Sequence, residues 1–386
     1  GGQTRITGTK MTEVEQISWV PMENGKKYEG ELYAKKSVNP NLNYLSGTEG
    51  VYATLTAAVI DLNLRGVSGP VRFLLTDASY SAGETFPITV DITSGDLPTA
   101  VNTVTIKPNT GVTASISGAP STSSIFKFNG ADYIIIDGSN TVGGSTKDLT
   151  IENTATAGGV IWFASKGTGA GATYNTVKNT NIVGYSNASG NYAIFLGGVS
   201  LGTAGDDNDY NTILNNTIGK AYYGIYALAS ATGKDNNLTI TQNTIGNATV
   251  GSSVGNIGLY LIQVLNSNIS QNEIFNATIG TTPKGISVTT GCSGLAIDRN
   301  KIYTIKYTGT TGYGGWGIHI APAIASSNIM VTNNMIYAMQ GDGYSSITGS
   351  SMCGILLDGA SDLIKVHYNS VNLYGNYSRS TATITA

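Results

Sequence analysis

The phrase that decides the fold is "NNTIGK" at 215–220, because four close copies follow it: "QNTIGN" at 242–247, "QNEIFN" at 271–276, "RNKIYT" at 299–304 and "NNMIYA" at 333–338. Each copy carries an Asn and, two positions later, an Ile. The Asn series continues to a sixth member, and its successive positions are 27, 29, 28, 34 and 35 residues apart: Asn216, Asn243, Asn272, Asn300, Asn334 and Asn369. A period of this length indicates a stacked repeat architecture.

A second set of phrases lies between the first, and each member places Gly before Ile or Leu. The clearest are "YGIYALA" at 223–229, "IGLYLIQ" at 257–263, "KGISVTT" at 284–290, "WGIHIAP" at 316–322 and "CGILLDG" at 353–359. Their apolar residues alternate with a period of two, which is typical of strands. Each period therefore holds at least two short strands, and no part of it shows helical spacing.

Two strands and a polar corner in every period predict an all-β parallel β-helix, or solenoid. Leucine-rich repeats need a Leu-x-x-Leu-x-Leu pattern and propeller blades need four strands in about forty residues, and the sequence fits neither. In a β-helix, one chain winds so that each coil lies about 4.8 Å above the previous one. The long intervals at 199–210 and 341–352 are then expected to be loops that leave the solenoid at one corner.

The Asn column is interpreted as a structural corner. A tight corner takes the backbone into the left-handed region, which Asn tolerates better than most residues. Stacked Asn side chains can also hydrogen-bond to the corner of the next coil and satisfy backbone groups that would otherwise be buried and unpaired. The column is therefore expected to build the fold and not to bind a ligand.

The two cysteines are expected to be free. Cys292 follows the phrase at 284–290, and Cys353 begins the phrase at 353–359. They lie two coils apart, and two coils correspond to roughly 9.6 Å of rise, which exceeds the usual Cα separation in a disulfide. Two buried thiols are expected instead.

The first third of the chain lacks the repeat. Residues 51–66 place four apolar side chains at helical spacing and end in Gly66 as a C-cap; the four are Leu55, Ala58, Val59 and Leu62. A solenoid needs an end cap over its open core. We therefore assign 49–120 to an N-terminal cap with a helix and the first irregular coils, and 121–386 to the regular β-helix.

Residues 1–48 carry much of the charge and are expected to form an N-terminal arm or leader. The stretch "KKYEGELYAKK" at 26–36 resembles a strand but has no visible partner. The chain begins with Gly1 and Gly2 and without Met, which is expected of a mature or trimmed product.

The charge content excludes two classes of partner. Only 12% of the residues are charged, and the net charge is −3. A nucleic-acid-binding protein needs a basic face to neutralise phosphates, and attachment to an anionic membrane needs polybasic segments. No apolar run approaches the roughly 20 residues of a membrane helix, so neither nucleic-acid binding nor membrane insertion is expected.

The distribution of acids does not favour catalysis. Glycoside hydrolases need two or three carboxylates at one cleft, and polysaccharide lyases need a base and often a calcium ion held by several carboxylates. Only "GDDNDY" at 205–210 clusters acids, as Asp206, Asp207 and Asp209. A calcium site and a solvated acidic turn both stay open there, and no other cofactor is expected. His319 and His367 fall in different phrases and form no dyad.

Three aromatic residues follow the repeated Ile on successive coils: Phe275, Tyr303 and Tyr337. If the Ile points inward, these side chains point outward and form a short stripe. Such a stripe can stack on sugars or meet another protein, or it can stiffen the corner by stacking on itself. Tyr222, Tyr223, Tyr226 and Tyr260 add further aromatic side chains nearby in the sequence.

Several stretches together resemble a known family: "YATLTAAVIDLNLRGVSGPVRFLLTDASYSAGETFPITV" at 52–90, "VTIKPNTGV", "FNGADYIIIDGSN", "LTIENT" and "NTVKNTNIVG". From about residue 48 onward, the chain is similar to secreted right-handed parallel β-helix repeat proteins, which are adhesin-like surface proteins of bacteria that use type IX secretion. The resemblance implies an extracellular or cell-surface location and brings no catalytic set. Members commonly carry a C-terminal sorting domain, which is expected to be missing or cleaved here.

The function favoured by the sequence is that of a non-catalytic extracellular structural or adhesin-like β-helix. Self-association into a surface fibre, through residues 1–48 or through the ends of the β-helix, is one form of this hypothesis. The alternative is a polysaccharide-binding or polysaccharide-degrading β-helix protein, with glycans as its partners.

Overall fold

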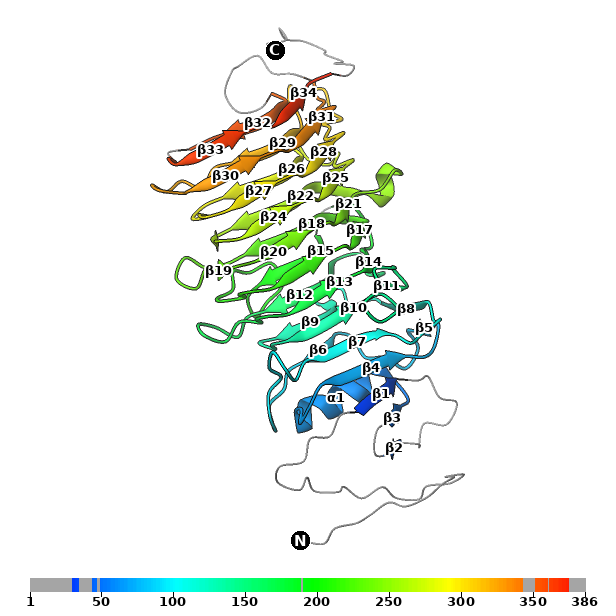
Figure 1. The fold of residues 1–386 in the computed structure, drawn as a ribbon. Helices are drawn as coiled ribbons and strands as arrows, with labels where there is room; N and C mark the ends of the chain where they lie inside the picture. Colours follow the sequence, from blue (N-terminus) through cyan, green and yellow to red (C-terminus); the bar gives the residue numbers. More distant parts are fainter. Residues whose placement is uncertain are drawn as a thin grey trace.

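The computed structural model of the chain is a long parallel β-helix (Figure 1). It describes residues 30–34, 44–46, 49–188, 190–342, 351–359 and 361–374. Within these residues, three long sheets run side by side along the solenoid. All of the described strand pairs are parallel except the pair of β2 with β3. The predicted parallel β-helix is confirmed, and each coil has three strands, which agrees with the prediction of at least two.

Sheet 1 contains 13 strands. In spatial order they are β2 (Tyr44–Ser46), β3 (Glu49–Tyr52), β1 (Gly30–Ala34), β4 (Val71–Leu75), β7 (Val104–Pro108), β10 (Ile134–Asp137), β13 (Thr176–Lys178), β16 (Thr212–Leu214), β20 (Thr239–Thr241), β24 (Asn268–Ser270), β27 (Ala296–Asp298), β30 (Ile329–Thr332) and β33 (Ile364–His367).

Sheet 2 contains 10 short strands. They are β5 (Ser79–Tyr80), β8 (Ala114–Gly118), β11 (Leu149–Asn153), β14 (Thr180–Val183), β17 (Thr217–Gly219), β21 (Thr244–Ile245), β25 (Glu273–Phe275), β28 (Lys301–Tyr303), β31 (Met335–Tyr337) and β34 (Ser370–Asn372).

Sheet 3 contains 9 strands. They are β6 (Ile88–Val90), β9 (Ser124–Asn129), β12 (Gly158–Ala164), β15 (Asn191–Gly197), β18 (Ala221–Leu228), β22 (Val254–Ile262), β26 (Lys284–Thr289), β29 (Trp316–Ile320) and β32 (Cys353–Leu357). A separate pair joins β19 (Asp235–Asn236) to β23 (Val264–Leu265), and a single 3-10 turn, η1, spans Val250–Ser252.

Each coil contributes one strand to sheet 1, sheet 2 and sheet 3 in turn. The first complete coil is β4, β5 and β6, and the same order repeats through β30, β31 and β32. The three-strand order therefore begins at Val71 and covers most of the segment that the sequence assigned to irregular coils. From residue 71 to residue 120, the chain differs from the later described coils in the regularity of its sequence and not in the order of its strands.

The helix α1 (Leu55–Arg65) lies at the β1–β4 end of the solenoid, as predicted (Figure 1). Its predicted buried face, Leu55, Ala58, Val59 and Leu62, joins the main core. The Thr54 side chain accepts a hydrogen bond from the Ala57 N–H at 3.0 Å, and the Gly66 N–H donates to Leu62 O at 2.8 Å. The Glu84 carboxylate also accepts from the Leu55 and Thr56 N–H groups, which fixes the start of the helix.

The strand β1 lies within the stretch 26–36 and has partners inside the chain. It pairs with β4 and with β3, and so extends sheet 1 beyond the first coil. The expectation that this stretch lacks a partner is wrong for residues 30–34. The remainder of the proposed arm, apart from 44–46, lies outside the described residues.

The core is a stack of aliphatic rows. In sheet 1, Ile213, Ile240, Ile269, Ile297 and Val331 lie in register on successive coils, and all are fully buried. The repeated Ile of each first phrase forms the matching row in sheet 2: Ile218, Ile245, Ile274, Ile302 and Ile336. Burying one such side chain is worth about 1.5–3 kcal/mol, so the rows account for the repetition in the sequence.

The glycine of each second phrase lies where sheet 3 meets the sheet 2 row. A Cβ atom on Gly285 would lie 2.4 Å from Ile302 Cγ2 and 2.6 Å from Gly317 O. Similar close approaches surround the other members of this glycine column: Gly224, Gly258, Gly317 and Gly354. The two sets of phrases recur together because each Ile fills the space that the missing Cβ leaves.

The two long loops leave the solenoid at different corners. The loop at 199–210 connects β15 to β16, from sheet 3 to sheet 1, whereas 341–352 connects β31 to β32, from sheet 2 to sheet 3. The prediction of one shared corner is therefore wrong; residues 343–350 lie outside the described part. Cys292 and Cys353 are both free, as predicted, although Cys353 is only partly buried.

Candidate ligand-binding surfaces

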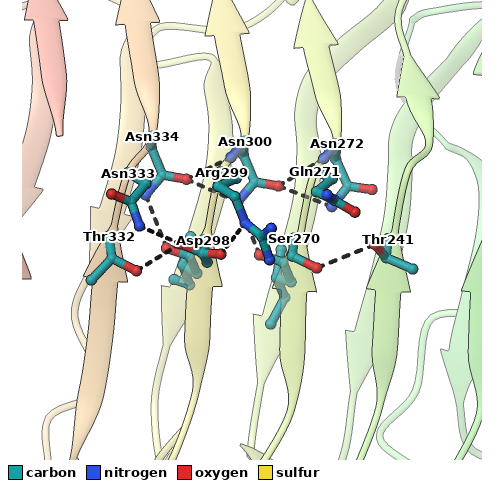
Figure 2. Close-up of polar contacts among 12 residues, drawn as sticks. Thr241, Ser270, Gln271, Asn272, Asp298, Arg299, Asn300, Thr332, Asn333 and Asn334 are labelled. Carbon is teal, nitrogen blue, oxygen red and sulfur yellow. Dashed lines mark hydrogen bonds and ion pairs between the residues drawn. The ribbon is translucent and has the colours of Figure 1, made fainter. Parts of the chain in front are cut away.

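The Asn series forms a ladder at the corner between sheet 1 and sheet 2, and all of its members except the last, Asn369, are buried (Figure 2). The Asn300 side-chain oxygen accepts from Asn272 N at 3.0 Å and from Asn272 Nδ2 at 3.0 Å. Asn300 Nδ2 in turn donates to Ile269 O at 2.9 Å. The same pattern runs from Asn216 to Asn369, which is the geometry expected of a structural corner.

The left-handed residue of each corner precedes the ladder Asn. Gln271, Arg299 and Asn333 have φ values of 57°, 54° and 56°, whereas the ladder Asn residues are not in the left-handed region. The predicted reason for Asn at this position is therefore wrong in part. Asn is required for its amide: the Asn334 side chain satisfies a backbone N–H and a backbone carbonyl of the preceding coil at once.

A second row of polar side chains lies beside the ladder (Figure 2). The Asp298 carboxylate accepts hydrogen bonds from Thr332 Oγ1 and Asn333 Nδ2, both at 2.9 Å, and from Arg299 Nε. Burial raises the pKa of Asp298, but these hydrogen bonds outweigh it and hold the pKa below its usual value. This carboxylate is already satisfied by its neighbours, so it is a poor candidate for a general acid or base.

The predicted aromatic stripe is a face-to-face stack. Phe275, Tyr303 and Tyr337 lie in register in sheet 2, with ring centroids 4.9 Å apart and planes 1° apart at both steps. Lys301 Nζ lies 4.8 Å from the Tyr303 ring centroid and 2.8 Å from Glu273 Oε1. A sugar stacks on a ring face, and these faces largely cover one another. The arrangement therefore favours stiffening of the corner over sugar binding.

The three acids of 205–210 point to separate partners. Asp206 Oδ2 accepts from Thr168 Oγ1, Asp207 Oδ2 from the Gly169 N–H and Asp209 Oδ1 from the Asn236 N–H, each at 2.7 Å. In the described part of the chain, no group of three or more His, Cys, Asp or Glu side chains is placed to hold a metal ion. These hydrogen bonds favour the acidic-turn interpretation.

A further acid, Asp235, is fully buried nearby and was not anticipated. Its Oδ1 accepts from the Asn208 N–H at 3.0 Å, while its Oδ2 has no hydrogen-bond partner among the described residues. Asn208 holds the same position one coil earlier, where its oxygen accepts from the Ala172 N–H and its Nδ2 donates to Gly197 O. Burial, assisted by the neighbouring acids, raises the pKa of Asp235 well above its usual value.

Asp235→Asn is expected to stabilise the protein at pH 7. Because the pKa is raised in the folded state, the unfolded chain loses this proton first, and the free energy of unfolding falls as pH rises from about 4. Each pH unit above that value lowers the free energy of unfolding by about 1.4 kcal/mol, until the pH reaches the pKa of Asp235 in the folded state. Urea denaturation at several pH values should show a gain for the variant at pH 7 that shrinks toward pH 4.

The matched control for this prediction is Asp206→Asn. Hydrogen bonds from Ser230 and Thr168 lower the pKa of Asp206, so its replacement should produce a small change of opposite sign. A variant Asp235→Asn with the same pH dependence as the wild type would contradict the prediction.

Among the described residues, the outer face of sheet 3 carries the largest group of aromatic contacts. Tyr192 and Tyr223 lie on adjacent strands with ring centroids 5.7 Å apart. Tyr226 and Tyr260 form a second pair on adjacent strands, with ring centroids 4.7 Å apart. We call these four partly exposed residues the tyrosine face. Tyr192 and Tyr226 pack against a small apolar cluster that is separate from the main core and consists of Trp162, Ala164 and Phe195.

A lysine and a tryptophan lie at each end of the tyrosine face. Lys127 Nζ lies 4.1 Å from the Trp162 ring centroid, and Lys284 Nζ lies 4.6 Å from that of Trp316. In both pairs the lysine and tryptophan are in register on adjacent strands. Burial lowers the pKa of Lys284 to about 8 and also lowers the pKa of Lys127.

His319 and His367 lie in different sheets, as expected, but His319 contacts Ser287. The distance from Ser287 Oγ to His319 Nδ1 is 3.2 Å, and Asp358 Oδ2 lies 3.9 Å from His319 Nε2. Burial, with the nearby Lys284 charge, lowers the pKa of His319 to about 4. The Ser287 side chain is only 1% exposed, so it cannot reach a substrate in this conformation.

The sequence did not reveal this surface as a unit. It drew attention to Tyr223, Tyr226 and Tyr260 beside the sheet 2 stripe, but the fold places them on sheet 3. No sequence pattern pointed to Lys127, Trp162 or Lys284, because only the register between strands places them next to the tyrosines.

No helix in the described residues is long and apolar enough to span a membrane. No family model and no curated protein matches the chain. Among solved structures, the chain is similar to the Dettilon tailspike protein with 12% identity and a TM-score of 0.46, over 83% of this chain and 58% of the tailspike chain.

Two further solved structures are similar in fold. An alginate lyase from a Paenibacillus species is 12% identical with a TM-score of 0.45, over 84% of this chain and 97% of the lyase. A surface adhesin of Streptococcus pneumoniae is 13% identical with a TM-score of 0.41, over 83% of this chain and 86% of the adhesin. At these identities the similarity concerns the fold.

Proposed function

We propose that the protein is a non-catalytic extracellular β-helix with a structural or adhesin-like role, of the kind that bacteria export by type IX secretion. The observation that carries the proposal is the state of the acids. Asp206, Asp207 and Asp209 are each held by a different donor, and Asp298 is satisfied by three donors. Hydrolysis of a glycan needs free carboxylates that converge on one cleft.

The second candidate is a polysaccharide-binding protein, and the tyrosine face favours it. Partly exposed Tyr side chains combine an apolar ring with a hydroxyl group, which suits ligands that are both hydroxylated and apolar. A polysaccharide-degrading activity has weaker support, because Ser287 and His319 are buried beside each other.

A reducing-end assay on pectins and alginates, run together with a glycan array, separates these possibilities. We expect no release of sugar by the purified chain. Release of sugar that is abolished in an Asp206→Asn, Asp207→Asn variant would overturn the proposal of a non-catalytic role. Binding on the array without release would support the second candidate.

Self-association into a fibre is a further part of the proposal, through the proposed arm at 1–48 or the ends of the solenoid. Parallel strand edges at a solenoid end can pair with another copy. Sedimentation velocity over a range of concentrations, together with electron micrographs of the full chain, tests this directly. A monomer at every concentration would contradict it.

A further inference from the structure

The outer face of sheet 3 presents two columns of side chains along the solenoid axis. Strand register places Lys127, Trp162, Phe195, Tyr226, Tyr260, Ser287 and His319 in one column. The other contains Tyr192, Tyr223, Ile257, Lys284 and Trp316. The sheet 3 strands that carry them follow one another along the molecule (Figure 1). Half of these side chains are buried: Trp162, Phe195, Ser287, His319, Ile257 and Trp316. The accessible strip therefore consists of the partly exposed members, which are Lys127, the tyrosine face and Lys284.

The tyrosine rings turn their edges outward. Tyr226 and Tyr260 are stacked with planes 9° apart, and Tyr192 and Tyr223 with planes 16° apart, so their faces are turned toward one another. The face of an aromatic ring carries the negative part of its quadrupole and the edge carries the positive part. Burial raises the pKa of Tyr223 to about 12 and also raises the pKa of Tyr192 and Tyr226. Their hydroxyl groups therefore remain neutral donors at physiological pH.

The charges of the strip are positive. Neither column contains an Asp or a Glu, and each contains one lysine. The Lys284 ammonium donates to Thr282 O at 3.1 Å, and the Lys127 ammonium donates to Val199 O at 3.4 Å. Both donate to neutral oxygens and lie over an indole ring. The nearby Asp91 carboxylate also acts on Lys127, so a ligand carboxylate would supply the missing opposite charge chiefly at Lys284.

Two acids lie near the ends of the strip. Asp91 forms an ion pair with Lys166, and Asp358 is an exposed residue at 3.9 Å from His319. Neither lies in the two columns, and the tyrosine face between the lysines is free of carboxylates. An anionic ligand that crosses the tyrosine face therefore meets donors and positive edges along its length.

We propose that this strip binds a linear acidic polysaccharide, a polyuronate, laid along the solenoid axis between Lys127 and Lys284. The coils repeat every 4.7–4.9 Å or so. The successive strands β15, β18, β22 and β26 each present a partly exposed tyrosine hydroxyl or lysine ammonium to a polymer with regular carboxylate and hydroxyl groups. The inference deepens the second candidate under the proposed function and rests on it. An acidic protein surface offers the same charge without the row of hydroxyl groups, and the experiment separates the two.

The test is a calorimetric titration of the full chain with polygalacturonate oligomers. The wild type should bind, and the affinity should fall as salt is added, because the contacts are partly ionic. The double variant Lys127→Met, Lys284→Met should lose about tenfold or more in affinity. The variant Tyr226→Phe, Tyr260→Phe keeps the ring stack and should also weaken binding, because it removes only the hydroxyl groups.

The matched control is Lys301→Met in sheet 2, which also removes a lysine that lies over an aromatic ring. It should bind polygalacturonate as the wild type does. A neutral oligosaccharide of the same length, maltoheptaose, should bind at least about tenfold more weakly. Circular dichroism and unfolding midpoints confirm that each variant is folded.

Three outcomes would overturn the inference: absence of polygalacturonate binding by the wild type, unchanged affinity of the folded Lys127→Met, Lys284→Met variant, or equally tight binding of poly-glutamate. The last outcome would assign the strip to acidic proteins. None of them bears on the non-catalytic role, which depends on the reducing-end assay alone. Release of sugar with binding intact would overturn the proposed role and leave this surface in place.

Discussion

Asn272→Ala is expected to lower the free energy of unfolding by about 3–5 kcal/mol, because it leaves several buried polar groups without partners. Asn272 Oδ1 accepts from the backbone N–H and the side-chain amide of Asn243, both at 3.0 Å. Asn272 Nδ2 donates to Ile240 O at 2.9 Å. Each buried donor or acceptor left unpaired costs roughly 1–3 kcal/mol. Equilibrium unfolding in urea measures the change.

The control is Asn268→Ala on the same coil. Asn268 is exposed at the start of β24, so its replacement should change stability by no more than about 0.5 kcal/mol. Hydrogen exchange adds a local measurement, since the Asn243 amide should lose protection in Asn272→Ala. If the two variants are equally stable, the ladder does not contribute the stability assigned to it.

The coil could be predicted from the sequence because every repeat places the same aliphatic residue in the same buried position. Ile274 and Ile302 are fully buried and in register on adjacent coils, so the number of residues between them is the length of one coil. The number of strands per coil was predicted only as at least two, because sheet 2 strands such as β25 and β28 are only 3 residues long. The phrase at 271–276 contains both the corner and the whole of β25, and a strand this short leaves no alternating pattern.

The left-handed corner could not be placed correctly from residue types. The residues that adopt it, Gln271, Arg299 and Asn333, differ from coil to coil, whereas the adjacent Asn is constant. The ladder Asn is constant because the hydrogen bonds of the corner need a side-chain amide that both donates and accepts. The left-handed demand is weaker, because a non-Gly residue accepts this conformation at a cost of about 1–2 kcal/mol.

The candidate binding surface was hidden for a different reason. Loops of unequal length separate Lys127 from Trp162 and Tyr226 from Tyr260, so sequence spacing does not show that they are neighbours. Conversely, Asp206, Asp207 and Asp209 are adjacent in sequence, yet their carboxylates accept from different segments. In a solenoid, the register between coils decides which side chains meet, and this register depends on where the core residues fall.

Gly285→Ala is the second large destabilisation that the fold predicts. A Cβ at this position would lie 2.4 Å from Ile302 Cγ2 and 2.6 Å from Gly317 O. The Ile302 side chain fills the corner between sheet 2 and sheet 3 and is fully buried, and Gly317 O belongs to the next strand of the same sheet. Neither atom can withdraw without moving a coil, and we expect a loss of about 3 kcal/mol in unfolding free energy.

The control for Gly285→Ala is Gly251→Ala, at an exposed position where a Cβ would meet nothing within 4 Å. The methyl group restricts the unfolded chain at both positions, which by itself would stabilise by about 0.4–1 kcal/mol. The difference between the two variants in urea denaturation therefore isolates the steric cost. Because a coil contacts only its neighbours, the loss should also appear first as faster hydrogen exchange in β26 and β29. If Gly285→Ala matches Gly251→Ala, the pairing of Gly with the sheet 2 Ile is not the constraint that makes the two phrases recur together.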